Sequence, residues 1–238
     1  MDKLSVNHLL GIKSLSKSDI NLIFKTASHF KEVIKVLVKP GATVIDAGAN
    51  FGYNSVLLGK QIGPDGTLVS FEPQRIIYQQ LCGNLILNNI YNATAYQAAL
   101  GDGSKGVANM KPVEYQAEWV NIGDTSIGED GEEVAVYTLD EIGINKLDFI
   151  KMDIQGYEYH ALLGAEKLLD KFKPVILLEN PSQTEECDVK AKQFLLDMGY
   201  EVYRYCGASN KEDCILIHPD SKKYVDALLI IDNIKTKY

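Results

Sequence analysis

The stretch VIDAGANFGYNS, residues 44–55, has the pattern of a buried strand that passes through a glycine-bearing turn into a helix. From residue 42 onward, short apolar runs continue to alternate with amphipathic segments. This repeated order of strand and helix predicts an α/β domain with a mostly parallel sheet, because parallel neighbours are joined by crossover helices. The run PVILLE is almost wholly apolar, which predicts a central strand covered on both faces.

Hydrophobic periodicity places the elements and divides the chain. Apolar residues at intervals of three and four predict a helical extension over 1–40. The stretch 101–137 breaks the alternation and is rich in Gly, Asp and Glu, so it predicts an inserted β-hairpin region. We expect one domain over 41–238 behind the extension. The predicted strands are 42–46, 67–71, 93–98, 147–152, 174–179, 199–205 and 213–217, and the predicted helices are 53–62, 75–89, 158–171 and 184–198.

Composition argues against several classes of protein. The formal net charge of -8 disfavours a nucleic-acid partner, because such binding depends on Lys and Arg that neutralise phosphates. The four cysteines are scattered without a C-x-x-C pair, and the four histidines lie far apart, so no metal site is expected. Neither a signal peptide nor an apolar run of the ~20 residues that span a bilayer is recognisable. We therefore expect a soluble, cytoplasmic protein without a membrane partner.

The turn after the first strand limits the choice of ligand. Asp46 closes the strand, and Gly48, Asn50 and Gly52 shape the turn. The dinucleotide fingerprint G-x-G-x-x-G needs glycine where this chain has Asn50 and a small residue where it has Tyr53. No G-x-x-x-x-G-K-[ST] motif occurs, so the phosphate-binding loop of nucleoside triphosphatases is excluded.

Two carboxylates and a helix start instead match a ligand with an amino-acid end and a ribose. Asp46 is placed to receive an ammonium group, directly or through water, and the N–H groups at the start of the 53–62 helix can hold a carboxylate. Glu72, at the end of VSFEP, is placed to accept hydrogen bonds from two ribose hydroxyls. This combination points to S-adenosylmethionine. The alternative is an ordinary strand-to-helix turn.

Further along the chain, six motifs carry a family resemblance. They are TVIDAGANFGYNS, VSFEPQ, NLILNN, AALGD, LDFIKMDIQGYEYHALLGA and PVILLEN, and they stand in the order typical of the FkbM family of S-adenosylmethionine-dependent methyltransferases. The resemblance covers about residues 38–218. It implies the class I methyltransferase fold, a Rossmann-like seven-stranded sheet whose last strand is antiparallel. It also implies O-methylation of a hydroxyl on a sugar, a polyketide or a similar acceptor.

The resemblance also implies roles for single residues. Glu72 would hold the ribose, and Ala99 with Asp102 would border the adenine. Asp153 would face the methionine or the acceptor, while Gln155 stands where the family often has Glu. Five residues would line the methionine end of the cofactor: Asp46, Gly48, Asn50, Gly52 and Ser55.

Methyl transfer from a sulfonium is an in-line displacement, so the protein must align the acceptor and assist its deprotonation. Asp153 is the predicted base, with Glu179 as the next candidate and Lys151 as a structural ion-pair partner of Asp153. Glu158 is a further candidate base or, alternatively, a carboxylate favoured by the helix dipole. His160 is a further candidate base, although it is expected to face elsewhere on the same helix.

The inserted region is the natural roof over an acceptor. It carries Trp119, Asn121 and Asp124, and Trp119 is either an acceptor platform or the core residue of a hairpin. The expected partner is a small-molecule or glycan hydroxyl acceptor, and a homodimer is a further expectation. Two alternative functions stay open at this point. One is a Rossmann-like enzyme that binds a nucleotide or nucleotide sugar, and the other is a non-catalytic module that keeps the fold.

The N-terminus carries a second resemblance. Residues 4 to about 34 resemble the opening of aspartate and ornithine carbamoyltransferase catalytic chains. The phosphate-binding Ser-Thr-Arg-Thr motif of those enzymes does not follow, so no carbamoyltransferase activity is implied.

Overall fold

The computed structural model describes residues 31, 34–110, 127–128, 131–178, 186–206, 212–224 and 234–235. Most of the predicted helical extension over 1–40 lies outside these residues, although 34–37 are helical. None of the helices within the described residues combines the length and apolarity needed to cross a lipid bilayer.

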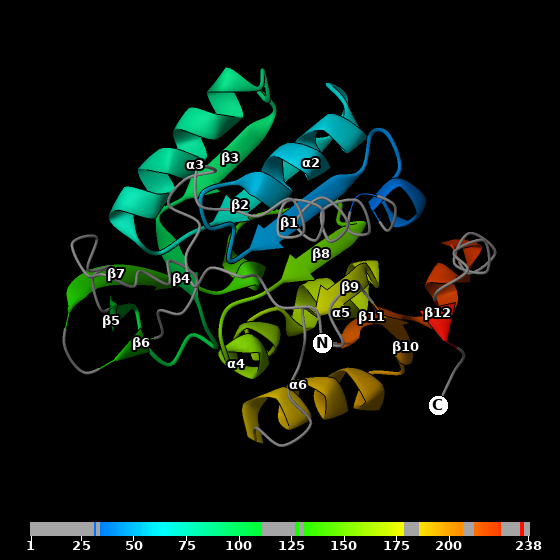
Figure 1. Cartoon of the computed structure of the whole chain (residues 1–238). Coiled ribbons are helices and arrows are strands. Elements are labelled where there is room, and N and C mark those ends of the chain that lie inside the picture. Colours follow the sequence, from blue (N-terminus) through cyan, green and yellow to red (C-terminus); the bar gives the residue numbers. More distant parts are fainter. Residues whose placement is uncertain are drawn as a thin grey trace, which may run out of the picture.

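The main sheet has the order β12-β10-β11-β9-β8-β1-β2-β3 (Figure 1). β11 is antiparallel to both of its neighbours, while the pairs from β9 through β8, β1 and β2 to β3 are parallel. Seven strands therefore form the expected mostly parallel sheet, and the two-residue β12 adds a short edge. The strands are β1 (Thr43–Ala47), β2 (Thr67–Phe71), β3 (Ala93–Tyr96), β8 (Phe149–Met152), β9 (Val175–Leu178), β10 (Glu201–Cys206), β11 (Glu212–Ile217) and β12 (Ile234–Lys235).

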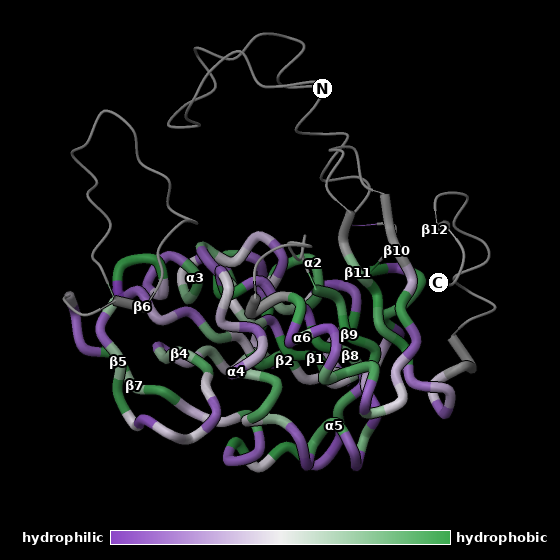
Figure 2. Tube along the Cα trace, turned by 90° about the horizontal axis from the view of Figure 1, so that it is seen from below, coloured by the Kyte–Doolittle hydropathy of each residue, from purple (hydrophilic) through white to green (hydrophobic). Residues whose placement is uncertain are grey.

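Helices cover both faces of this sheet. Figure 2 shows α2 and α3 above the strands and α5 below them. The predicted single helix over 158–171 is two helices that meet near Gly164, where the backbone packs against Gly101. A Cβ at Gly164 would lie 2.0 Å from the Gly101 carbonyl oxygen, so the chain needs glycine there. The helices are α2 (Tyr53–Ile62), α3 (Arg75–Leu87), α4 (Glu158–Leu163), α5 (Glu166–Phe172) and α6 (Glu186–Asp197), with short 3₁₀ turns η2 (Leu139–Glu141) and η3 (Pro219–Tyr224).

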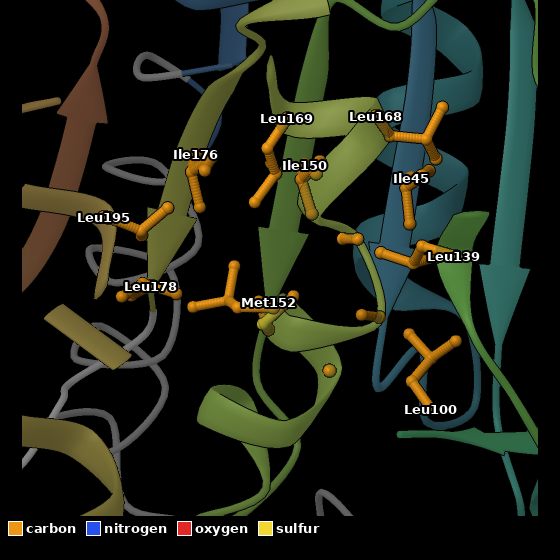
Figure 3. Packing of buried hydrophobic residues seen from close by; sticks show 14 of the residues in the cluster. Ile45, Leu100, Leu139, Ile150, Met152, Leu168, Leu169, Ile176, Leu178 and Leu195 are labelled. Carbon is orange, nitrogen blue, oxygen red and sulfur yellow. The ribbon is translucent and has the colours of Figure 1, made fainter. Parts of the chain in front are cut away.

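The core lies on the two faces of the sheet, and alternate strand residues supply each side. Ile45 and Ile150 belong to the cluster under α4, α5 and α6, where Figure 3 shows them packed against Leu168 and Leu169. Val44 belongs to the opposite cluster, under α2 and α3. This alternation decides which polar strand residues become buried beneath α2.

The inserted region forms a second sheet of order β4-β7-β5-β6. The predicted strand 93–98 divides in two, because the chain leaves the main sheet after β3 and pairs with β7 instead. Arg75, at the start of α3, forms a 2.8 Å ion pair with Glu132 of β7. These strands are β4 (Ala98–Leu100), β5 (Val107–Met110), β6 (Ile127–Gly128) and β7 (Glu132–Tyr137).

Candidate functional site

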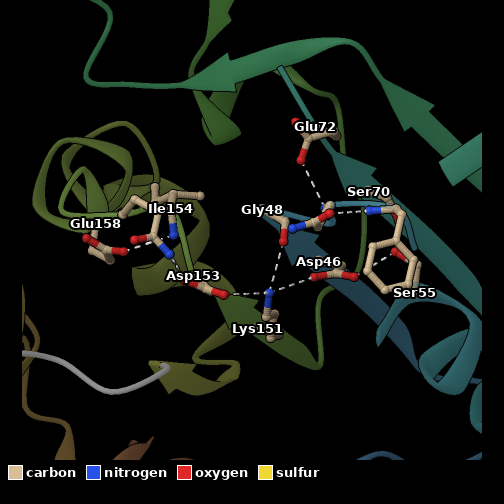
Figure 4. Close-up of polar contacts among 12 residues, drawn as sticks. Asp46, Gly48, Ser55, Ser70, Glu72, Lys151, Asp153, Ile154 and Glu158 are labelled. Carbon is tan, nitrogen blue, oxygen red and sulfur yellow. Dashed lines mark hydrogen bonds and ion pairs between the residues drawn. The ribbon is translucent and has the colours of Figure 1, made fainter. Parts of the chain in front are cut away.

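Three neighbouring strands each carry one polar residue in an otherwise apolar run, apart from the threonines that begin β1 and β2, and the register brings these residues side by side. Asp46 of β1 pairs with Ser70 of β2 on one side and with Lys151 of β8 on the other. Ser55 of α2 covers them and donates a 2.6 Å hydrogen bond to Asp46 Oδ2. The Ser55 and Ser70 hydroxyls are 2.9 Å apart. We call these four residues the buried polar cluster (Figure 4).

The loops after β1, β2 and β8 leave the sheet beside this cluster, at what we call the carboxyl edge. Gly48 has a φ of +76°, and a Cβ there would lie 1.8 Å from the Asp153 carbonyl oxygen. Its neighbour Asn50 also takes a left-handed φ, of +50°. Glycine is therefore required at 48 both for its backbone conformation and for the contact between the two loops.

Asp46 and Ser55 differ from their predicted positions. Both were expected to line the methionine end of the cofactor, but both have 0% exposure. The cause is the strand period, because Asp46 shares its sheet face with Val44 and therefore points under α2. Both side chains thus lie beneath the turn rather than on its surface, and a contact of Asp46 with the cofactor through water stays a prediction.

Lys151 connects the two loops from inside the protein. Its Nζ donates a 3.0 Å hydrogen bond to the Gly48 carbonyl oxygen. The same nitrogen lies 3.5 Å from Asp46 Oδ1 and 3.7 Å from Asp153 Oδ2. The expected ion pair between Lys151 and Asp153 is present, and the pairing with Asp46 is an addition that sequence reasoning missed.

Glu72 stands at the tip of β2, as expected, and is tied to the turn after β1. Its Oε2 accepts the Asn50 N–H at 2.9 Å, and its Oε1 accepts the Gln74 N–H at 2.9 Å. Burial raises the pKa of Glu72 to about 7, although both N–H groups favour the ionised carboxylate. The two oxygens keep acceptor capacity for ligand hydroxyls, since each carboxylate oxygen has two lone pairs.

The loop after β8 holds the predicted bases in different environments. The Asp153 side chain is 30% exposed and accepts a 3.1 Å hydrogen bond from the Gln155 side-chain amide. Glu158 is buried, and its Oε1 accepts the Ile154 N–H at 2.9 Å. The structure therefore gives Glu158 a contact within its own loop, which matches the alternative of a carboxylate at the helix start.

Asp102 and His160 meet between the insertion and α4. Nδ1 of His160 lies 2.9 Å from Asp102 Oδ2, and the Ser104 N–H donates to Asp102 Oδ1 at 2.8 Å. Hydrogen bonds from Ser104 and His160 hold the pKa of Asp102 below its ordinary value. The Tyr157 ring stacks on His160 with centroids 4.7 Å apart. Sequence reasoning expected His160 to face elsewhere and did not foresee this pair.

The remaining predicted residues divide into two groups. Ala99 is buried in the small core of the second sheet, and Gly52 lies in the turn after β1 with a φ of +95°. Four predicted residues lie outside the described part of the chain: Trp119, Asn121, Asp124 and Glu179. Over the described residues, no group of three or more His, Cys, Asp or Glu is arranged to hold a metal ion.

Comparison with known proteins identifies two kinds of relative. The sequence profile of the methyltransferase FkbM domain matches residues 46–202. The crystal structure of methyltransferase FkbM from Methylobacillus flagellatus KT superposes with a TM-score of 0.55 at 21% identity, over 77% of this chain and 45% of that chain. The O-methyltransferase TomG of Streptomyces achromogenes, solved with S-adenosylmethionine, superposes with a TM-score of 0.53 at 14% identity, over 87% of this chain and 93% of that chain. At these identities the two structures establish the shared fold.

The second kind of relative is a carbamoyltransferase. The aspartate carbamoyltransferase catalytic subunit of Flavobacterium johnsoniae is 34% identical over 136 residues, which is 52% of this chain and 43% of that protein. The chain thus spans less than half the length of this relative. The match is longer than the predicted resemblance over residues 4 to about 34.

Proposed function

The chain belongs to the FkbM methyltransferase family, and from this premise we propose that it transfers the methyl group of S-adenosylmethionine to a hydroxyl of a small-molecule or glycan acceptor. The observation that carries the proposal is the position of Glu72. Its carboxylate is held at the tip of β2 by the N–H of Asn50, beside the glycine turn that follows β1. The carboxylate could accept hydrogen bonds from a pair of ribose hydroxyls, and the adjoining turn could hold the amino-acid end of the same ligand.

The donor set at the carboxyl edge fits the proposed cofactor. Glu72 would accept the ribose hydroxyls, and the first N–H groups of α2 would face the carboxylate, since Gly52 provides no side-chain cap there. Asp153, whose side chain is 30% exposed, offers a negative charge to a cationic ligand. TomG, which shares the fold, was solved with S-adenosylmethionine, and this adds support.

When bound, S-adenosylmethionine supplies an activated methyl group. The protein itself must therefore remove the proton of the acceptor hydroxyl. We assign this task to His160, whose Nδ1 is held by Asp102 at 2.9 Å. When Nδ1 carries the proton and donates it to Asp102, this contact fixes the ring and leaves Nε2 to accept the proton of the acceptor hydroxyl. The predicted base Asp153 is instead held against Lys151 and Gln155.

The proposal is tested by turnover. The full chain would be incubated with methyl-labelled S-adenosylmethionine and fractions of hydroxylated small molecules and sugars, and products would be followed by mass spectrometry. The expected result is label on an acceptor oxygen with one S-adenosylhomocysteine formed per methyl. Cofactor binding without transfer to any hydroxyl fraction would favour the non-catalytic alternative, and label found on nitrogen would assign another acceptor class.

A further inference from the structure

We propose that Lys151 is a positioning residue for the amino-acid end of the cofactor. It pairs with the buried Asp46, and so leaves Asp153 as the carboxylate that binds the ligand's α-ammonium group. This inference rests on the proposed S-adenosylmethionine chemistry and deepens it. Asp153 thereby takes the ammonium-binding role that the sequence predicted for Asp46.

Burial excludes Asp46 from direct contact with a ligand. The residue has 0% exposure, and its Oδ2 is engaged by the Ser55 hydroxyl at 2.6 Å. Its other oxygen faces Lys151 Nζ at 3.5 Å. A ligand ammonium would have to displace the lysine from a closed interior to reach this carboxylate.

Lys151 fixes both walls of the carboxyl edge at once. Its Nζ binds the Gly48 carbonyl oxygen of one loop and lies 3.7 Å from Asp153 Oδ2 of the other. Two backbone features join the same loops: the Asp153 N–H donates to the Ala47 carbonyl at 3.1 Å, and the Gly48 backbone packs against the Asp153 carbonyl. The side chain of Asp153 is therefore held in place relative to the turn after β1.

Counting charges shows where a cation would bind. Two negative groups, Asp46 and Asp153, lie within 4 Å of one positive group, Lys151. Glu72 also interacts with Lys151 and Asp46, but burial raises its pKa to about 7 and so disfavours its charged form. The opposite charges of the buried residues Asp46 and Lys151 cancel. The excess negative charge therefore stays on Asp153, the one member of the three with substantial exposure. An ammonium that contacts Asp153 would offset this remaining negative charge.

Three ligands separate the sources of positive charge in a binding experiment. S-adenosylmethionine has an ammonium and a sulfonium, S-adenosylhomocysteine has the ammonium alone, and methylthioadenosine has neither. Asp153→Asn in the full chain should weaken binding of the first two about 10- to 100-fold, the usual value of a charge-assisted hydrogen bond. Its affinity for methylthioadenosine should be unchanged. Asp170→Asn, at a site exposed on α5, is the control for lost net charge.

The role of Lys151 needs a variant that keeps the charge of the cluster. Asp46→Asn combined with Lys151→Met removes one charge of each sign and leaves Asp153 negative. The pair should bind S-adenosylhomocysteine about 10-fold more weakly, with methylthioadenosine unchanged, because Asp153 loses the contact that orients it. Asp153→Glu tests the same point without touching the interior, since it keeps the charge and displaces the carboxylate.

Each of the other possible outcomes would refute one part of the proposal. Unchanged affinity of Asp153→Asn for S-adenosylhomocysteine, with or without a loss for S-adenosylmethionine, would refute the ammonium assignment. An equal loss for methylthioadenosine would show a general collapse of the site. Wild-type affinity in Asp153→Glu or in the double variant would refute the positioning role of Lys151. If the wild type binds none of the three ligands, the proposed function itself fails.

Discussion

The buried carboxyl of Glu72 predicts a pH dependence of stability. Burial raises its pKa from 4.5 to about 7, with repulsion from Asp46 acting the same way, while the N–H groups of Gln74 and Asn50 and the charge of Lys151 oppose the rise. The folded protein therefore holds this proton more tightly than the unfolded chain. The resulting stabilisation is fully present below pH 4.5 and is lost as the pH rises through about 7.

The size of the effect follows from the shift. From 4.5 to about 7, at about 1.4 kcal/mol per pKa unit, it amounts to about 3 kcal/mol of unfolding free energy. Glu72→Gln cannot titrate. Relative to Glu72→Gln, the wild type should therefore lose about 2–3 kcal/mol of unfolding free energy between pH 5 and pH 8.

Urea denaturation of the ligand-free chain at several pH values measures this difference, with Glu166→Gln at the exposed start of α5 as the control. S-adenosylhomocysteine affinity gives a second measurement, because ribose hydroxyls donate to the ionised carboxylate. The dissociation constant of S-adenosylhomocysteine should fall roughly eightfold from pH 6 to pH 7.5 in the wild type and stay constant in Glu72→Gln. A pH-independent difference in stability, or one that moves in favour of the wild type as the pH rises, would refute the reasoning.

Three further variants test other contacts. Gly48→Ala should lose about 3 kcal/mol or more of unfolding free energy in urea denaturation, because residue 48 has a positive φ and a Cβ there would clash with the Asp153 carbonyl. A loss below about 1 kcal/mol would contradict the contact between the two loops. His160→Gln should slow single-turnover methyl transfer to a hydroxyl acceptor about 10²–10⁴-fold with unchanged S-adenosylhomocysteine affinity, and an unaltered rate would remove His160 from the chemistry. Arg75→Gln should change the thermal stability by less than about 1 kcal/mol, because its ion pair with Glu132 is exposed, and a larger loss would show a structural role.

Much of the fold could be predicted because the strands and helices have strong, separate periods. β2 spans Thr67–Phe71 and α2 spans Tyr53–Ile62, as the sequence pattern indicated. The close packing of Gly164 between α4 and α5 was not predictable from pattern, since its neighbours there, Gly101 and Thr138, are distant in sequence. Local periodicity contains no information about such a contact.

In the candidate site, too, only the local features could be predicted from the sequence. Glu72 could be placed at a strand tip, because the strand end is a local feature. The burial of Asp46 and Ser55 depends on strand register and on the helix that covers the face, neither of which a single sequence shows. The signal that could have found the buried polar cluster was a polar residue beyond the first position in each of three mostly apolar strands. The pair of Asp102 and His160 joins segments 58 positions apart and had no such signal.

Calorimetric titration of the full chain with S-adenosylmethionine and, separately, with NAD tests the central claim most directly. We expect S-adenosylmethionine to bind with one molecule per chain. We also expect Glu72→Ala to weaken this binding about 10- to 100-fold. Tighter binding of NAD than of S-adenosylmethionine, or no binding of S-adenosylmethionine at all, would contradict the claim.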